Sequence, residues 1–508
     1  MLSKIKNEYL VFFISFLIYF PIILWGGYFL DDNYRSVHAY YAWTGDYRPI
    51  ADWIYYILGF GTDFVDTFPL NYIIQFLFVS YFILFFTKNI QVKFLLNENL
   101  KNYISLSISL LFISPFFMQN LYFRYDSLIM VLSIIFACMP FFFNDKKIDL
   151  IFCIMVLFTY QSSIVGYMCV VILRLLVMSQ NNEEKLIIYK EVGKSILVFI
   201  ASIIIFFLCA KLFITPNSYA ENHTSFVTSF KMFSENITYS LDILSFSNST
   251  LDYALVFFSL IIALLFLFRI ISCNSKINNF DIFLICTGVI FVFTICILNM
   301  NIFLLKPRLY SRTYIGVGFA LLLIGLSLTF LITFKEQAFR KYVYFYKFLF
   351  LSIYLMCLNI FYIGYNYIKE TEKYSENLIN NISYDLSTLG KRQYKSIVAY
   401  GEPLKTLRSN NLIHRYPILL NNFYDSNTIS HHKFRIFYDL LLNKGFLFKR
   451  IGYSGTPISK EYNKYINSKP TIKRSEYNII ITNNDELFIY LKKEDIPKKS
   501  PLARSRLD

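Results

Sequence analysis

Two adjacent carboxylates and an arginine follow the first long apolar run of the chain. Asp31 and Asp32 come directly after that run, and Arg35 falls on the same face if a helix begins at Asp32. Charged groups at a membrane edge are costly to place there, which makes them candidates for function. An aspartate near its reference pKa of about 4 is ionised and able to take a proton from a hydroxyl group. The alternative is a solvated loop whose charges only end the apolar run.

A compact group of cations follows a later apolar run. Lys306, Arg308 and Arg312 lie in one short turn beside the aromatic Tyr310. Arginine binds phosphate through two parallel hydrogen bonds and keeps its charge, so this turn suits a phosphate group. The alternative is contact with lipid headgroups in general.

Two more polar turns separate apolar runs. Arg124 and Asp126 stand in the turn 119–126, where they could instead cap and anchor helix ends. Tyr160 and Gln161 break the apolar segment 149–178, which reads either as a helical hairpin or as a single bent span.

The elements that position these residues are membrane spans. The chain has 508 residues, of which 56% are hydrophobic and 19% aromatic, with a mean hydropathy of +0.46. Such values exclude an ordinary soluble domain. The net charge of +15 fits cytoplasmic loops and anionic lipid more simply than nucleic acid, and we predict no nucleic-acid partner.

We expect about eleven transmembrane helices, because apolar runs of roughly 17 to 25 residues recur. The spans lie near residues 9–30, 68–87, 103–118, 127–143, 149–160, 163–178, 195–214, 252–272, 281–299, 314–334 and 346–368.

The distribution of lysine and arginine predicts the orientation. Basic residues gather in the loops on the side of the N-terminus, as the positive-inside rule expects of the cytoplasmic side. The polar turns described above then all face outward. The stretch 50–60 is too short to span and is expected to lie along the interface, following Trp43 and Arg48 in the first outer loop.

Composition changes after residue 367, and we predict two domains. Residues 1–368 form the transmembrane catalytic domain, and residues 369–508 form a small extracytoplasmic α/β domain. Within it, 395–400 reads as a strand, 477–491 as a hairpin turning at 483–484, and 412–442 as helical. His431 and His432 read as surface histidines and 501–508 as a disordered tail. The fold class is therefore an all-α polytopic membrane protein with a C-terminal α/β domain.

The sequence lacks the motifs of several common classes of enzyme. The sequence has no Walker loop, no HExxH pattern, no dinucleotide glycine fingerprint and no metal-ligand spacing. The eight cysteines form no CxxC pair and read as small hydrophobic residues. We predict no cofactor, and a divalent cation is possible but not indicated.

Carboxylates beside cations at an outer membrane surface suit glycosyl transfer from a lipid-phosphate sugar. The leaving group is already a phosphate, so it needs positive charge rather than a general acid. The acceptor hydroxyl needs a single base, whereas glycosidases need two carboxyl groups with different protonation states.

The motifs also resemble a known family, the polytopic, phage-type O-antigen glucosyltransferases, which are serotype-converting glucosyl transferases of the GT-C class. The resemblance rests on residues spread over about 25–180: Asp31, Asp32, Arg35, Trp43, Gly45, Arg48 and Pro49, the run 123–127 and the run 160–163. It implies transfer of glucose from undecaprenyl phosphate to lipid-linked O-antigen by an inverting mechanism. It also implies two partners, a lipid-phosphate glucose synthase and a small flippase, and a GT-C-like fold in the bacterial inner membrane with a periplasmic active site.

The candidate residues divide by role. Asp31 or Asp32 is the expected base, and the other orients it or the sugar. We expect Asp126, Tyr160 and Gln161 to hold the sugar hydroxyls, and Trp43 to stack on a sugar or pack at the interface. The expected substrate-binding cations are Arg35, Arg48, Arg124, Lys306, Arg308 and Arg312.

Three alternatives remain open. They are a GT-C transferase using another lipid-phosphate sugar, a lipid-linked oligosaccharide flippase or transporter, and a membrane anchor that presents the C-terminal domain.

Overall fold

The structure is a computed structural model of the chain. It describes residues 5–29, 31–61, 64–216, 225–307, 309–332, 341–390, 392–400, 407–423, 441–442, 444–451, 468–482 and 485–491. Arg308, the histidine pair 431–432, the hairpin turn 483–484 and the tail 501–508 lie outside these residues.

The chain forms two compact units. The first comprises residues 1–27, 39–365 and 414–422, and the second comprises 28–38, 366–413 and 423–508. The main division falls close to the predicted boundary at 368, and the two domains 1–368 and 369–508 stay a prediction. The sequence did not suggest that segment 28–38 would group with the C-terminal part.

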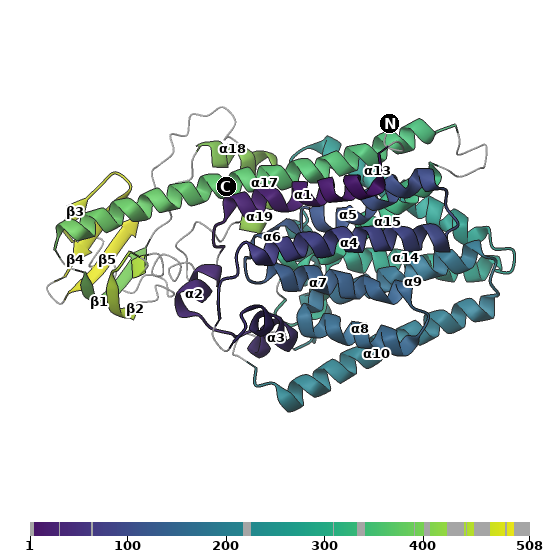
Figure 1. Ribbon diagram of the computed structural model, residues 1–508, viewed down its shortest axis with the longest axis horizontal. Coiled ribbons are helices and arrows are strands. Elements are labelled where there is room, and N and C mark those ends of the chain that lie inside the picture. The colour runs from purple at the N-terminus through teal and green to yellow at the C-terminus, as the bar shows by residue number, and fades with distance from the viewer. Residues whose placement is uncertain are drawn as a thin grey trace. The chain divides into compact units, whose positions relative to one another are not determined.

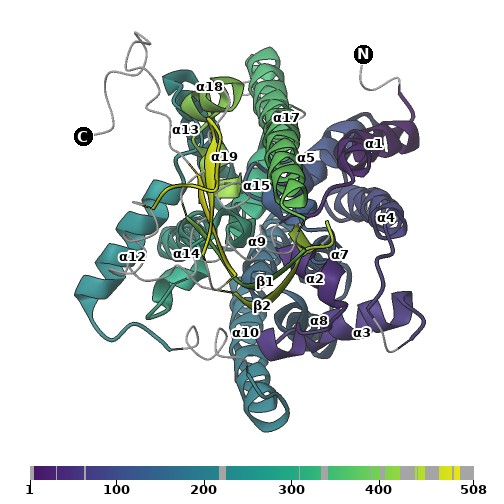
Figure 2. The same ribbon diagram turned by 90° about the vertical axis from the view of Figure 1, so that its left-hand side faces the viewer.

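Every predicted span overlaps a helix, and these helices run side by side (Figure 1), seen closer to end-on in Figure 2. They are α1 (Asn7–Trp25), α4 (Leu70–Lys93), α5 (Lys101–Ile113), α7 (Ser127–Cys138), α8 (Lys146–Thr159), α9 (Val165–Gln180), α10 (Lys185–Phe213), α13 (Thr250–Ser272), α14 (Asn279–Leu298), α15 (Ile315–Leu331) and α17 (Val343–Thr388).

These helices indicate a membrane protein. Among the described residues, seven helical segments are long and apolar enough to cross a bilayer. The other predicted spans, α5, α7, α8 and α15, are shorter helices. The total of about eleven spans therefore stays a prediction.

The short helices α5 and α15 lie inside the bundle. Nearly all of their side chains are buried, including those that would face lipid on a peripheral helix. Small residues allow the close approach, since a Cβ at Gly318 would lie 3.2 Å from the carbonyl oxygen of Leu111. A helix covered by its neighbours needs no full-length apolar surface of its own.

The chain doubles back between α8 and α9. Asp149 near the start of α8 and Arg174 near the end of α9 form an ion pair with a 2.6 Å N–O distance. This contact requires antiparallel helices, so the segment is a hairpin and the single bent span is excluded.

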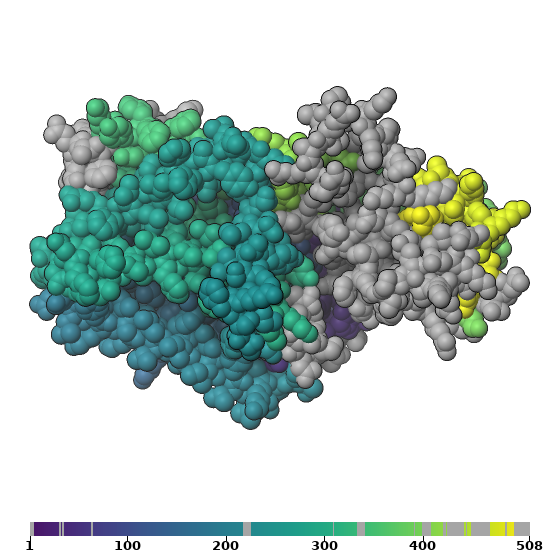
Figure 3. Space-filling view, turned by 180° about the vertical axis from the view of Figure 1, so that it is seen from behind, coloured from purple at the N-terminus to yellow at the C-terminus, as the bar shows by residue number. Residues whose placement is uncertain are grey.

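Short elements connect the long helices. They are α2 (Asp31–His38), η2 (Thr44–Asp46), α3 (Pro49–Leu58), η3 (Glu98–Leu100), α6 (Met118–Tyr122), η4 (Met139–Phe142), η5 (Gln161–Ile164), α12 (Phe230–Ile243), η6 (Met300–Phe303), η7 (Ser311–Thr313), α18 (Leu407–Arg415) and α19 (Ile418–Phe423). Helix α3 buries Tyr55 and exposes Trp53, the pattern expected of a helix along an interface. Helix α12 lies on the surface in the space-filling view (Figure 3), and most of its side chains are not buried.

The second unit contains a five-stranded sheet in the order β2-β1-β5-β4-β3. Its strands are β1 (Gln393–Tyr400), β2 (Leu447–Ile451), β3 (Ile472–Lys473), β4 (Tyr477–Ile481) and β5 (Glu486–Leu491). Strand β1 is parallel to β2 and β5, whereas β4 is antiparallel to β5. The predicted strand at 395–400 and the pairing within 477–491 are confirmed. Of the predicted helical stretch 412–442, the structure describes the end of α18 and helix α19.

The polar end of α17 carries the sheet. Leu378, Ile382 and Leu386 join a buried cluster with strand residues such as Ile397 and Ile489.

Asp385 connects the same end of α17 to the sheet. It accepts hydrogen bonds from Arg474 Nε at 2.8 Å and from the Tyr477 hydroxyl at 2.7 Å. The hydrogen bonds from Arg474 lower the pKa of the Asp385 carboxyl.

We predict that Asp385→Asn weakens the attachment of the sheet by about 1–2 kcal/mol, because Arg474 and Tyr477 lose a charged acceptor. A carboxyl with a lowered pKa stabilises the fold above its unfolded pKa of about 4, and the contribution is lost as the pH falls through the folded pKa. Hydrogen exchange of the β4 and β5 amides in the full-length protein measures the effect. Glu376→Gln, on an exposed carboxylate of the same helix, is the control. Equal protection in both variants would contradict the prediction.

Candidate active site

Four of the predicted site residues line one cavity in the first unit. This cavity has a volume of about 340 Å³, and we call it the arginine cavity. The predicted residues on its wall are Arg48, Tyr160, Gln161 and Arg312. They come from the turn after η2, the tip of the α8–α9 hairpin and η7, so distant segments of the chain meet there.

The rest of the lining is divided between polar and apolar groups. The other polar residues are Asp46, Tyr47, Ser162, Asn301, Tyr310 and Thr313. The apolar residues are Leu157, Ile164, Ile203, Phe206, Phe207, Phe226, Met300, Phe303 and Leu304. A lining that contains both charged and apolar side chains suits a ligand that is itself part polar and part hydrocarbon.

Arg48 has a guanidinium with unused donor capacity. Its terminal carbon lies 4.8 Å from the centre of the Tyr160 ring, a cation–π contact. Its Nε is buried and has no hydrogen-bond partner among the described residues. A buried donor of this kind is costly unless something binds it, and an anionic ligand is the simplest candidate.

Arg312 is held in place through its backbone. Its N–H donates to Gln119 Oε1 at 3.0 Å, and its carbonyl accepts from Asn120 at 3.0 Å and from the Tyr160 hydroxyl at 3.2 Å. The guanidinium lies 4.9 Å from the Phe123 ring centre. The main chain is therefore anchored independently of the charged group that lines the cavity.

Trp43 and Asp126 form a buried pair beside the cavity but are not among its lining residues. Trp43 Nε1 donates to Asp126 Oδ1, and the indole stacks on Tyr55 with a ring separation of 5.0 Å. Both Trp43 and Asp126 are buried. The contact favours a positioning role for this pair.

Arg124 is engaged inside the first unit. Its NH1 lies 2.6 Å from Asp66 Oδ2, its NH2 donates to the Gly26 carbonyl, and it stacks over Phe68. These contacts join the end of α1 to the turn before α7 and favour an architectural role over substrate binding. Lys306 is exposed and does not line the arginine cavity.

The remaining predicted residues, Asp31, Asp32 and Arg35, lie on α2 in the second unit. Asp32 is buried and its Oδ2 accepts from the Phe29 amide at 3.1 Å, and Arg35 is buried as well. Asp31 is the first residue of the helix. Their approach to the arginine cavity stays a prediction.

The structure adds residues that sequence reasoning did not select. Asp46 and Asn301 line the arginine cavity. Asp46 stands between Gly45 and Arg48, inside a motif already singled out, so its position was the available signal. Asn301 carried no such signal.

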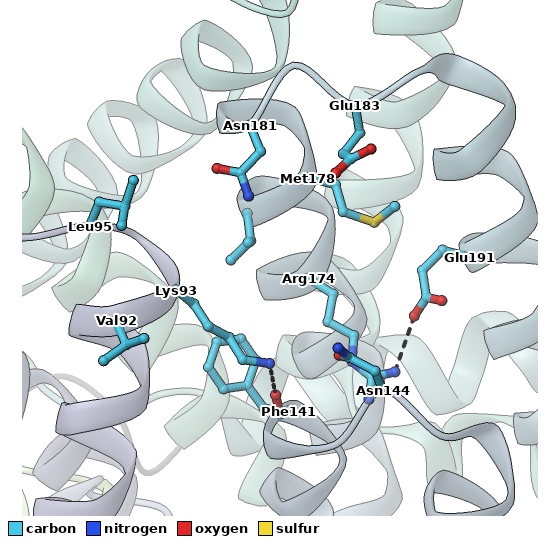
Figure 4. Close-up of a pocket in the computed structure, with 11 residues that line it drawn as sticks. Val92, Lys93, Leu95, Phe141, Asn144, Arg174, Met178, Asn181, Glu183 and Glu191 are labelled. Carbon is cyan, nitrogen blue, oxygen red and sulfur yellow. Dashed lines mark hydrogen bonds and ion pairs between the residues drawn. The ribbon is translucent and has the colours of Figure 1, made fainter.

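A second cavity of about 500 Å³ lies at the opposite ends of α8 and α9, and we call it the Lys93 cavity. Figure 4 shows Lys93 donating to the Phe141 carbonyl and Arg174 paired with Glu191. Arg174 also makes two bonds to Asp149, at 2.6 and 2.8 Å. Lys146 donates to Asp149 and to Glu191, so two cations and two carboxylates form one network.

Among the residues that the structure describes, no group of three or more His, Cys, Asp or Glu side chains could hold a metal ion.

With this geometry established, comparison with known proteins identifies the class. The family model described as glucosyl transferase GtrII matches residues 20–324, more than half of the chain. The chain belongs to this family and is a glycosyltransferase, which confirms the resemblance seen in its motifs. The family supports a role in glucosyl transfer during O-antigen modification.

A relative comes from Salmonella phage P22, a protein described as an uncharacterized 55.3 kDa protein in the gtrB 5' region. It is 26% identical over 423 residues, which cover 79% of this chain and 82% of the phage protein. No solved structure matches the chain.

We predict that Arg174→Met destabilises the first unit by about 3–5 kcal/mol, because Asp149 is left buried without its main partner. The double variant Arg174→Met, Asp149→Leu should recover part of this loss, since no buried charge then remains unpaired. Thermal unfolding in detergent measures both. Lys194→Met, at an exposed position on α10, is the control. A double variant less stable than the single variant would contradict the account.

Proposed function

We propose that this glucosyl transferase moves glucose from undecaprenyl-phosphate glucose to lipid-linked O-antigen at the outer face of the bacterial inner membrane. The observation that carries the proposal is the arginine cavity, which is lined by Arg48 and Arg312 and also by nine apolar side chains. A lipid phosphate likewise combines an anionic group with a hydrocarbon chain.

The two arginines suit the phosphate of the donor. Negative charge grows on the phosphate as the sugar leaves, and preorganised cations stabilise that charge most in a site shielded from water. Both guanidinium groups lie against aromatic rings, which fixes their orientation before the substrate arrives.

The apolar wall suits the start of the carrier chain. Phe206 and Phe207 come from α10, and Phe226 comes later in the chain. Most side chains of α10 are not buried against the rest of the protein, so much of the helix is available to lipid. A polyprenyl chain could therefore pass from the cavity into the bilayer beside α10.

Asp31 or Asp32 is the proposed base, and the other orients it or the sugar. The base takes the proton of the acceptor hydroxyl while that oxygen bonds to the anomeric carbon. The bond between this carbon and the phosphate oxygen breaks, and undecaprenyl phosphate leaves. Attack from the face opposite the phosphate inverts the configuration. We propose that Tyr160 and Gln161 help to hold the sugar, and that Asp126 positions the turn through Trp43.

The proposal also includes the fold, the orientation in the membrane and the partner proteins. The enzyme has a GT-C-like fold, and its active site and C-terminal domain face the periplasm. A lipid-phosphate glucose synthase and a small flippase supply the donor. Arg35, Lys306 and Arg308 remain candidates for phosphate contact.

The closest alternative is a transferase of the same kind that uses another lipid-phosphate sugar. A flippase or transporter is a less suitable reading, because it needs a polar path across the membrane. The arginine and Lys93 cavities lie at opposite ends of α8 and α9, whose intervening turns are largely apolar.

We predict that one of Asp31→Asn and Asp32→Asn lowers turnover by about 100-fold to 10,000-fold, the usual contribution of a general base. Purified enzyme with undecaprenyl-phosphate glucose and lipid-linked acceptor provides the assay. Asp242→Asn, on an exposed carboxylate of α12, is the matched control. Full turnover in both α2 variants would remove Asp31 and Asp32 from the mechanism.

We predict that Arg48→Ala and Arg312→Ala each raise the donor KM by about tenfold to 100-fold, because each removes charged hydrogen bonds to phosphate. The acceptor KM should change much less. The backbone of Arg312 keeps its own hydrogen bonds in the variant, so the effect reports the side chain. Lys231→Ala, at an exposed cation on α12, is the control. A larger effect on the acceptor than on the donor would place the phosphate elsewhere.

A further inference from the structure

One carboxylate lines the arginine cavity among the residues that the structure describes there, and it belongs to Asp46. The other charged side chains on the wall are Arg48 and Arg312, and the remaining polar groups are neutral. This carboxylate has no role in the mechanism described above.

The turn that presents Asp46 is rigid. The amides of Asp46 and Arg48 both donate to the Trp43 carbonyl, at 3.0 and 2.9 Å. Tyr47 between them has a φ of 62°, in the left-handed region, which turns the chain so that both neighbours lie at the cavity.

Contacts from three other elements fix this turn. The backbone amide of Thr44 donates to Asp52 Oδ2 at 2.7 Å, and the Gln161 side chain donates to the Tyr47 carbonyl at 3.2 Å. Trp43 is held by Asp126 and by stacking on Tyr55. Such a supported turn places a carboxylate and a guanidinium, two residues apart, with little freedom to move.

Charge decides what Asp46 can bind. A carboxylate repels a phosphate, so the phosphate belongs with the arginines, and Asp46 must face a neutral part of the substrate. In a lipid-phosphate sugar, the neutral part bonded directly to the phosphate is the sugar ring. An ionised carboxylate only accepts hydrogen bonds and can take two at once, which matches neighbouring sugar hydroxyls.

We propose that Asp46 accepts hydrogen bonds from the hydroxyl groups of the donor sugar and selects the configuration of that sugar. The inference rests on the proposed function and deepens it. A site that hydrogen-bonds a hydroxyl discriminates against an analogue in which that hydroxyl is missing or moved, because the analogue cannot form the same hydrogen bonds. Asp46 is thus a specificity residue, whereas the arginines recognise the phosphate common to every such donor.

The test compares three ligands on the full-length enzyme: undecaprenyl-phosphate glucose, its galactose epimer, and undecaprenyl phosphate without sugar. Asp46→Asn should lower kcat/KM for the glucose donor by about tenfold to 100-fold, because the substrate loses hydrogen bonds to a charged acceptor. Its preference for glucose over galactose should shrink by about tenfold or more. Binding of the sugar-free carrier phosphate should stay unchanged or tighten, because a nearby negative charge is removed.

The same three ligands define the outcomes that overturn the inference. An unchanged preference for glucose in Asp46→Asn would remove Asp46 from sugar selection. A parallel loss of affinity for undecaprenyl phosphate would show that Asp46 only supports the cavity. Arg48→Ala serves as the opposite control, because it should weaken the carrier phosphate and keep the sugar preference. Failure of the proposed function looks different: the wild-type enzyme itself would transfer no sugar from any of these donors, and the inference would fall with it.

Discussion

The buried ion pair between Asp149 and Arg174 fixes the helix arrangement on which the arginine cavity depends. Buried charges are costly in a membrane protein, and they persist where they are paired and hydrogen-bonded. Arg174 satisfies this condition with two bonds to Asp149 and others to backbone carbonyls. The pair holds α8 against α9 near their far ends. Because the two helices are short and stiff, their common tip is then fixed as well, and that tip provides Tyr160 and Gln161 to the cavity.

Arginines in the first unit have different roles according to their partners. Arg124 and Arg174 each face a carboxylate, at 2.6 Å in both cases, and hold helices together. Arg48 and Arg312 lie against aromatic rings and line a cavity. Contact with an aromatic face orients a guanidinium, and a guanidinium that lines a cavity suits an anionic substrate. The same residue type thus provides structure at Arg124 and Arg174, and we propose that it provides recognition at Arg48 and Arg312.

Sequence reasoning predicted most of the helices and part of the site. Apolar run length located the helices because bilayer thickness sets that length. The stretch 477–491 was predicted as a hairpin, and it contains the paired strands β4 and β5. Polar turns between apolar runs identified Arg48, Tyr160, Gln161 and Arg312, which line the arginine cavity. They also identified Arg124 and Lys306, which do not line it. The partners of those residues were not predictable. Arg124 pairs with Asp66, which is 58 positions away in the sequence, and Trp43 donates a hydrogen bond to Asp126, which is 83 positions away. Such pairings depend on how the helices pack rather than on a local sequence pattern. The grouping of segment 28–38 with the C-terminal unit likewise depends on packing and was not predictable from a local sequence pattern.

We propose that the arginine cavity holds the phosphate of the lipid-linked donor. The most direct measurement is an experimental structure of the full-length enzyme in a lipid nanodisc with undecaprenyl phosphate bound. We expect phosphate density within hydrogen-bonding distance of Arg48 and Arg312, with the first isoprene units against Phe206 and Phe207. Phosphate density in the Lys93 cavity, or anywhere away from these two arginines, would contradict it.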